Sequence, residues 1–554
     1  MLTVVAAIVM LGLLIFVHEL GHFFAFKAIG VKVLKFSLGF DPVLFKRQIG
    51  ETSYQIGWVP IGGYVRPLGE HDDDEVAVED RGRAVGDKPL WARSIAFAAG
   101  PVMNLVFPVL IFWVVFSLPG HELSSRVGMI IAGMPAETAG MMAGDRVVEI
   151  DGKKVEYWSD LLETISERPG RTFPVVVSRH GQRIPLNVTA EAVREVDRLG
   201  DEVTVGKIGV VSSVYDARVV VTGPETPAAE AGILSWDAIR AVNGTKAKDW
   251  IEFREAFEAA GSGSVTLQVE RRDETTVKTG KRGRKDRSTA KTSELTLVVK
   301  SPGTVLGAGL DTAQVYVRDI EPGSPADTAG VKPGDKVISV DGRSVGYWHV
   351  LGEMFRRNPD KTFEIVFGRG ASTFSASLKM LKRTERDEFK QEYVYYDLGA
   401  ANDSDFTEGE TVRRPFSISQ GIIRAFETAG EIIRVTYLAV FKLVTGKLSL
   451  KTVGGPIMIF DMAGTVAKKG AMSYFWFMGL ISINLGIFNL LPIPILDGGH
   501  LMLAAVEAIA RRPLSRRVRM FTSYVGVAFL ASMFVLVFKN DIERYWDSIM
   551  GFFR

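Results

Sequence analysis

The sequence predicts a polytopic α-helical membrane protein with four transmembrane helices, interrupted by a set of repeated α+β domains. Two observations carry this prediction. Of the 554 residues, 47% are apolar, and the excess hydrophobicity is concentrated in four segments. Between the second and third segments, one spacing pattern occurs three times. A chain of this length forms several domains, and its formal charge of +2 indicates no particular partner.

Each apolar segment is close to the ~20 helical residues that cross a bilayer. The segments are residues 2–26, 95–118, 475–495 and 520–538. Four crossings leave both chain ends on the same side of the membrane. The loop between the last two segments contains Arg511, Arg512, Arg516, Arg517 and Arg519. Because basic loops remain in the cytoplasm, we expect both termini and residues 118–475 on the outer side.

The first segment carries ionisable side chains where a bilayer disfavours them. Residues 18–22 read HELGH, directly after the apolar residues 4–16. Each such group costs roughly 2.5 to 3.5 kcal/mol near the bilayer centre, so a compensating cation is expected. Four residues apart on a helix, His18 and His22 share one face, and Glu19 lies beside a metal-bound water. The chain has no cysteine, and this ligand set suits zinc; the alternative is two histidines and a solvated glutamate without a metal.

Asp497 is the predicted third ligand. The first and third segments cross in the same direction, and Asp497 follows the third, so it reaches a depth similar to that of His22. Pro492 and Pro494 break the helix just before it, which a membrane tolerates where the backbone is buried in protein or lines a wet cavity. A catalytic zinc commonly has three protein ligands and one open position. The alternative is a helix-end carboxylate at the membrane surface.

The region between the second and third segments contains three copies of one pattern. Each begins with an Ala-Gly pair, at Ala139, Ala231 and Ala329. Six positions after the alanine comes an aspartate, thirteen after it a glycine in an Asp-Gly or Asn-Gly turn, and nineteen after it a tryptophan. The order of predicted turns, helices and strands resembles PDZ domains in permuted form. The full fold prediction is therefore four transmembrane helices with inserted tandem PDZ-like α+β domains.

The predicted domain limits follow from these segments and repeats. They are 1–120 for the first membrane half, 121–212, 213–305 and 306–412 for the PDZ-like domains, and 413–554 for the second membrane half. Residues 420–443 alternate apolar and charged groups, which predicts an amphipathic helix on the outer surface or against the PDZ-like domains. Residues 273–293 are basic without aromatic residues, which favours a solvated loop over a nucleic-acid site.

Several separated motifs resemble the site-2 protease family of intramembrane zinc metalloproteases, most closely its bacterial branch, the regulator of sigma-E proteases. Besides HELGH, they are Gly62-Gly63-Tyr64-Val65, Gly100-Pro101-Val102-Met103-Asn104, Val453-Gly454-Gly455-Pro456-Ile457, and the stretch from Asn484 through Asn489 to Asp497-Gly498-Gly499-His500. The resemblance covers both membrane halves. Close family members carry two PDZ domains, so a third is a departure.

The resemblance implies zinc bound by His18, His22 and Asp497, with Glu19 as the general base. It also suggests that residues 54–65 form a hairpin that dips into the membrane and holds unwound substrate through Gly62, Gly63 and Tyr64; the alternative is an ordinary interfacial loop. Asn489 is a candidate for stabilising the oxyanion, or else it bonds a neighbouring helix.

The expected activity is peptide hydrolysis in regulated intramembrane proteolysis. The implied substrates are transmembrane segments already cut by a site-1-type protease, such as anti-sigma factors, and remnant signal peptides. The implied location is the bacterial inner membrane, with the PDZ-like domains and both termini in the periplasm and the active site towards the cytoplasmic leaflet. The PDZ-like domains would either bind peptides or exclude bulky substrates. Two alternatives remain, a metal-ion transporter and an inactive membrane scaffold.

Overall fold

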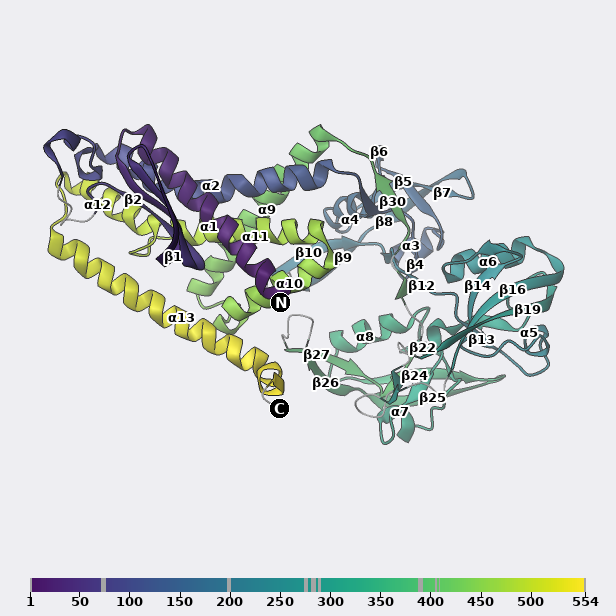
Figure 1. Ribbon diagram of the computed structural model, residues 1–554. Coiled ribbons are helices and arrows are strands. Elements are labelled where there is room, and N and C mark those ends of the chain that lie inside the picture. Colours follow the sequence, from purple (N-terminus) through teal and green to yellow (C-terminus); the bar gives the residue numbers. More distant parts are fainter. Residues whose placement is uncertain are drawn as a thin grey trace.

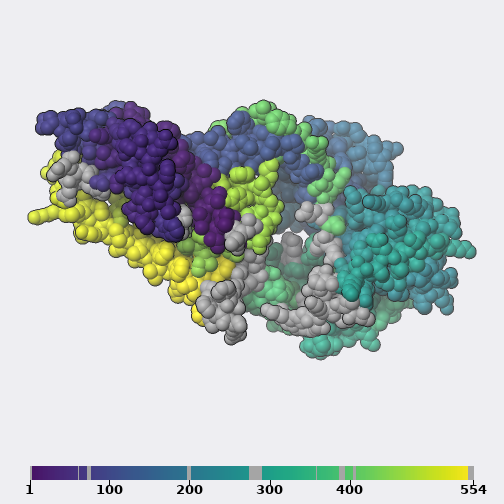
Figure 2. Space-filling view, viewed as in Figure 1, coloured from purple at the N-terminus to yellow at the C-terminus, as the bar shows by residue number. Residues whose placement is uncertain are grey.

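The computed structural model describes residues 2–70, 76–196, 201–273, 278–279, 285–286, 290–386, 392–403, 406–407 and 409–552. It has a helical part, formed by both ends of the chain, and a β-rich part formed by the middle (Figure 1). In the space-filling view the purple and yellow chain ends lie together, and the teal middle region forms the opposite end of the molecule (Figure 2).

Among the described residues, four helices are long and apolar enough to span a bilayer, as the sequence predicts. They are α1 (Leu2–Ala28), α2 (Leu90–Ser117), α11 (Ala471–Leu490) and α13 (Arg516–Phe552). Helix α11 ends five residues before the predicted limit because Pro492 and Pro494 cannot continue a helix. The apolar windows of α1, α2 and α11 are each 39% buried, whereas that of α13 is 6% buried. Helix α13 is therefore the least packed of the four.

Three further helices complete the helical part. They are α9 (Ile418–Val444), α10 (Pro456–Lys469) and α12 (Asp497–Ala510). Helix α9 corresponds to the helix predicted on the outer surface or against the PDZ-like domains. It packs mainly against α2 and α11, and its Arg424 contacts Glu122 and the ring of Tyr157 in the first module. Its residues Ala425 and Ala429 enter the same apolar core as the spans, and the Thr436 hydroxyl donates to Asn484 Oδ1 at 2.8 Å. Small side chains on one face allow this close approach.

The loop after α1 forms strands β1 (Val33–Ile49) and β2 (Thr52–Pro67), which pair with several register shifts. As a result, residues 35–38 of β1 lie between residues 53–56 and residues 63–66 of β2. The predicted hairpin at residues 54–65 is thus wrong in detail: its two arms are separated by β1. The tip is apolar and exposed, with Phe40, Phe45 and Trp58 among its exposed side chains.

The β-rich part contains three modules, each with a four-stranded sheet of the same order. The first has β6 (Lys153–Lys154), β5 (Arg146–Ile150), β7 (Thr172–Arg179) and β8 (Gln182–Thr189), with helices α3 (Pro135–Thr138) and α4 (Trp158–Ser166). The second has β15 (Thr245–Lys246), β14 (Ala238–Val242), β16 (Ser262–Arg272) and β19 (Thr292–Pro302), with α5 (Pro227–Glu230) and α6 (Trp250–Ala259). The third has β23 (Arg343–Ser344), β22 (Lys336–Val340), β24 (Thr362–Arg369) and β25 (Ser372–Lys379), with α7 (Pro325–Thr328) and α8 (Trp348–Arg357).

The remaining strands form short pairs around and between the modules. These are β3 (Gly120–Leu123) with β30 (Thr411–Arg414), β4 (Met129–Ile130) with β11 (Val210–Val211), β9 (Glu191–Val196) with β10 (Glu202–Lys207), β12 (Val214–Tyr215) with β29 (Phe406–Thr407), β13 (Val219–Val221) with β20 (Leu310–Thr312), β17 (Lys278–Thr279) with β18 (Lys285–Asp286), β21 (Asp319–Ile320) with β28 (Ala400–Ala401), and β26 (Leu381–Arg386) with β27 (Glu392–Asp397). Single 3-10 turns are η1 (Val78–Asp80), η2 (Val85–Asp87), η5 (Ala313–Val315) and η6 (Leu450–Thr452). Through β20, the second module extends beyond residue 305. Most of the basic segment 273–293 lies outside the described residues.

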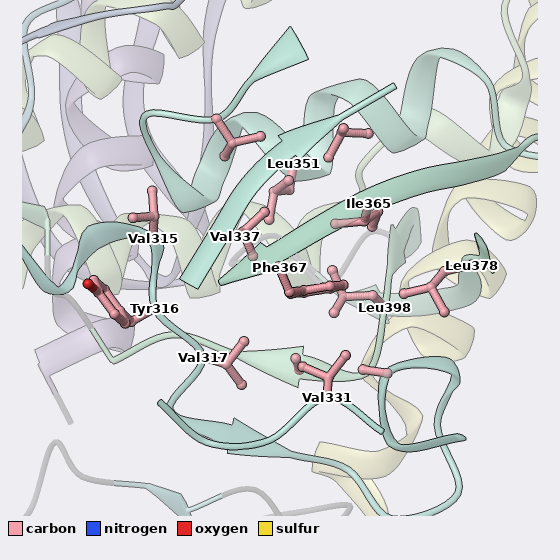
Figure 3. Close-up of a cluster of buried hydrophobic side chains, with 14 of the residues drawn as sticks. Val315, Tyr316, Val317, Val331, Val337, Leu351, Ile365, Phe367, Leu378 and Leu398 are labelled. Atoms are coloured by element: carbon pink, nitrogen blue, oxygen red, sulfur yellow. The ribbon is translucent and has the colours of Figure 1, made fainter. Parts of the chain in front are cut away.

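Each module has its own apolar core. Figure 3 shows the third, in which Val337, Ile365 and Phe367 of the sheet pack against Leu351 of α8. The repeated aspartate has the same role in every module, because it forms an ion pair with an arginine from the strand after the long helix. The pairs are Asp145 with Arg179, Asp237 with Arg271, and Asp335 with Arg369. Each arginine stands forty positions after the repeated alanine, a signal present in the sequence.

Candidate metal centre

Helix α1 and the start of α12 bring the three predicted metal ligands together. His18 Nε2 lies 3.2 Å from His22 Nε2 and 3.2 Å from Asp497 Oδ2. His22 Nε2 lies 3.3 Å from Asp497 Oδ1. A zinc ion bound at about 2.0 to 2.1 Å by tetrahedral ligands separates them from one another by about 3.3 Å. The three side chains therefore have the spacing that a tetrahedral zinc ion requires.

The orientation of His22 leaves its Nε2 free to bind a cation. Its Nδ1 lies 2.9 Å from the backbone oxygen of Ala96 on α2. That oxygen only accepts, so Nδ1 carries the proton, and a neutral imidazole then has a lone pair on Nε2. This lone pair faces the carboxylate of Asp497, an arrangement that a cation between them stabilises. The donor set thus fits a bound metal.

Helix α2 also leaves room for His22 Nε2, because it has a glycine at the point of contact. A Cβ at Gly100 would lie 2.2 Å from His22 Nε2. One helical turn further along, the side-chain amide of Asn104 contacts His18 Nδ1 at 3.1 Å. Ala96, Gly100 and Asn104 are spaced four residues apart and so share one face of α2. The role of the Gly-Pro-Val-Met-Asn motif beside the imidazoles was not predicted from the sequence, although the spacing of four between Ala96, Gly100 and Asn104 is a signal for one shared helix face.

The break after α11 positions Asp497. Helix α11 ends at Leu490, and α12 begins at Asp497. Two glycines allow the first turn of α12 to approach this break closely, because a Cβ at Gly498 would lie 2.2 Å from the Leu491 oxygen and one at Gly499 would lie 2.4 Å from the Ile493 oxygen. The packed break thereby directs the carboxylate towards α1.

Glu19 lies next to the ligand set and against β2. A Cβ at Gly63 would lie 3.4 Å from Cγ of Glu19, and the backbone of Val65 hydrogen-bonds to the Glu19 carboxyl group. Of the other predicted residues, Gly62 abuts the Phe40 ring, and the Tyr64 ring stacks on that ring at 6.3 Å. Asn489 is half-buried at the end of α11, and its side chain makes no hydrogen bond to any described residue.

The profile of peptidase family M50 matches residues 6–533. The chain belongs to peptidase family M50. Among its M50 relatives is the regulator of sigma-E protease RseP of Escherichia coli, which is 28% identical over 542 residues and is matched over 97% of each chain. A protein named as a zinc metalloprotease in Neisseria meningitidis is 28% identical over 548 residues, covering 98% of this chain and 99% of that one. RseP of Salmonella typhimurium is 28% identical over 97% of this chain and 98% of its own.

Among solved structures, the chain is similar to the PDZ domain of the SdrC-like protein from Listeria innocua. The identity is 19% over 16% of this chain and 91% of that one, with a TM-score of 0.13. A likeness of this size does not establish a shared fold.

Membership of M50 confirms the resemblance seen in the sequence. The protein is a zinc-dependent membrane metalloprotease, and zinc is its cofactor. Its four apolar helices and its RseP relatives make it a multi-pass protein of the bacterial inner membrane. No comparison favours a transporter or an inactive scaffold.

Proposed function

We propose that this M50 protein hydrolyses peptide bonds within transmembrane segments, with zinc held by His18, His22 and Asp497 and with Glu19 as the general base. One observation carries the assignment: the two imidazole Nε2 atoms of α1 and the carboxylate of Asp497 on α12 converge within 3.2 to 3.3 Å of one another in the membrane part of the chain. Such a group of ionisable side chains is costly in a bilayer unless a cation compensates it.

The residues divide the chemistry between them. His18, His22 and Asp497 would hold a zinc ion, which when bound would supply Lewis-acid polarisation of a water molecule and of the scissile carbonyl. Glu19 accepts a proton from the attacking water and then donates it to the leaving amine. Asn489, at the end of α11, is our candidate donor to the developing oxyanion, because its amide makes no hydrogen bond to a described residue.

Strand β2 offers a place for an unwound substrate. Residues 63–66 pair with β1 along one edge, and the backbone of Val65 hydrogen-bonds to Glu19, so the other edge of this strand lies beside Glu19. A helical transmembrane segment hides its peptide bonds, so it must unwind locally before cleavage. We propose that the extended segment adds to this edge by backbone pairing, with Gly63 permitting close approach and with Gly62 and Tyr64 shaping the turn and the strand beside it.

The proposed topology follows from the arginines between α12 and α13. They mark the cytoplasmic side, so the three modules and both termini lie in the periplasm and the metal site lies towards the cytoplasmic leaflet. The modules are proposed to be tandem PDZ-like domains that correspond to the predicted ranges 121–212, 213–305 and 306–412, except that the second continues to β20. On the periplasmic side of the metal site, they would act as peptide-binding domains or as a filter against bulky substrates.

The proposed substrates are membrane proteins whose periplasmic domain a site-1-type protease has already removed. Anti-sigma-factor-like proteins and remnant signal peptides fit this class. The Escherichia coli and Salmonella typhimurium relatives are named as regulators of sigma-E. Cleavage would release a cytoplasmic fragment and so complete regulated intramembrane proteolysis.

The test uses the full chain reconstituted in liposomes with a single-span peptide. We expect wild type to cleave it, Glu19→Gln to retain zinc without cleaving, and chelator-treated protein to do neither. The control is Glu79→Gln, an exposed carboxylate outside the site, which should cleave like wild type. Cleavage by Glu19→Gln would remove Glu19 from the mechanism. Metal uptake into liposomes without cleavage would favour transport, and zinc binding without either activity would favour a scaffold.

A further inference from the structure

Asn104 is a fully buried polar residue of α2 that the proposed mechanism does not use. Its side chain is 0% exposed, and its amide contacts His18 Nδ1 at 3.1 Å. With Nδ2 turned to the imidazole, the amide oxygen Oδ1 has no hydrogen-bond partner among the described residues. An unsatisfied buried acceptor costs about 1 to 3 kcal/mol, so this position requires an explanation.

The proton on His18 decides which way the amide must face. A histidine that binds a metal through Nε2 keeps its proton on Nδ1, and an N–H group can only donate. The group facing Nδ1 must then be an acceptor. The two ends of an asparagine amide have the same shape. With Oδ1 towards His18 the amide accepts the Nδ1 proton, and Nδ2 takes the place in which Oδ1 has no partner among the described residues. The opposite orientation fits only a His18 whose Nε2 carries the proton and cannot bind metal.

We propose that Asn104 is a positioning residue for the metal site: its side-chain carbonyl accepts the Nδ1 proton of His18 and thereby holds Nε2 in the metal-binding tautomer. The inference deepens the proposed function and rests on the ligand role given there to His18. Ala96 does the same for His22 with its backbone oxygen, four residues before Gly100 on the same face of α2. One face of α2 thus sets the tautomers of both imidazoles.

An uncharged acceptor suits this position in the membrane. A carboxylate is a common partner of metal-bound histidines, but a charge at the bilayer centre costs about 2.5 to 3.5 kcal/mol. An amide supplies the acceptor without the charge. The backbone of Asn104 is also fixed, because its carbonyl accepts a hydrogen bond from the Ser482 hydroxyl of α11 at 2.9 Å.

The test compares zinc affinity in two nearly isosteric variants of the full chain in detergent. Asn104→Leu removes the acceptor, and we expect its zinc Kd to rise about 10- to 100-fold, the usual effect of losing an outer partner of a metal ligand. Asn104→Asp keeps an acceptor oxygen, ionised or protonated, and should bind zinc close to wild type. Affinity is measured by competition with a chromophoric chelator, and the visible spectrum of the cobalt-substituted protein reports the ligand geometry.

Ser482→Ala is the matched control, since it removes a hydrogen bond to the same residue without touching the imidazole. It should lower thermal stability and leave the zinc Kd unchanged. Wild-type zinc affinity in a folded Asn104→Leu would overturn the proposal. So would weak binding by Asn104→Asp, because an amide that donates would be lost in both variants; this comparison stands even if Asn104→Leu fails to fold. If His18→Leu also binds zinc like wild type, the proposed function itself fails.

Discussion

Gly100 shows how a single residue can decide whether the site exists. Glycine inside a helix costs about 1 kcal/mol relative to alanine, yet α2 carries one at the point of contact with α1. A Cβ there would lie 2.2 Å from His22 Nε2, the atom proposed to bind zinc. The metal site, and not the stability of α2, therefore explains why residue 100 is a glycine.

Gly100→Ala should abolish or strongly weaken zinc binding, because the methyl group displaces the His22 ring or occupies the metal position. We expect at least a 100-fold loss of peptide cleavage, in line with the about 10²-fold cost of small misplacements in active sites. Atomic absorption measures the zinc content of the variant, and cleavage of the single-span peptide measures its activity. Gly12→Ala on α1, where a Cβ meets nothing within 4 Å, is the control and should retain both.

At the scale of elements, a buried carboxylate of α13 joins this helix to the start of α10, and Asn540, Arg544 and Tyr545 add further hydrogen bonds to neighbouring segments. Asp541 is 0% exposed and caps the start of α10 from outside that helix. It accepts hydrogen bonds from the backbone N–H groups of Gly455 at 2.9 Å, Ile457 at 2.8 Å and Met458 at 3.2 Å. These are the groups that a helix start leaves unpaired, and the helix dipole favours a negative charge there.

Asp541→Ala should lower the free energy of unfolding by about 0.5 to 2 kcal/mol, the range for loss of a helix cap. Equilibrium unfolding in detergent measures the change. The neighbouring Lys539→Gln removes an exposed charge and should change stability by no more than about 0.5 kcal/mol. Equal effects of the two substitutions would show that the cap does not hold α13.

At the scale of the whole molecule, the first module is fixed to the membrane part at defined contacts. Strand β3 pairs with β30, and Glu122 accepts from Arg414 at 2.5 Å and from Arg424 of α9 at 2.6 Å. The guanidinium of Arg424 also stacks over the ring of Tyr157, which precedes α4. The first and third modules meet where the Ile130 N–H donates to the Tyr347 hydroxyl at 3.2 Å. These contacts join the first module to α9 and to the third module.

If the modules act as a filter, weakening the contacts of Glu122 with Arg414 and Arg424 should admit bulky substrates. Wild type should prefer a trimmed substrate over one with an intact periplasmic domain. Glu122→Gln should reduce that preference by about tenfold or more, since hydrogen bonds to charged groups contribute about 1.5 to 3 kcal/mol. Cleavage rates of both substrates give the ratio. Glu163→Gln, exposed on α4 of the same module, is the control. An unchanged ratio in Glu122→Gln would count against the filter.

The sequence by itself determined what depends on spacing within one element. The lengths of the apolar runs gave the four spans, the offset of four placed His18 and His22 on one face, and the fixed offsets gave three repeats whose strands and helices form where expected. These features follow from local helix and strand geometry, so neighbouring residues suffice to predict them.

Only the tertiary structure decided which elements meet. It placed α9 against the spans, threaded β1 between the arms of β2, and set Ala96, Gly100 and Asn104 of α2 behind the two imidazoles. Such contacts join residues far apart in the chain, and they depend on how closely small side chains let helices and strands approach. The pattern along one element does not contain that information.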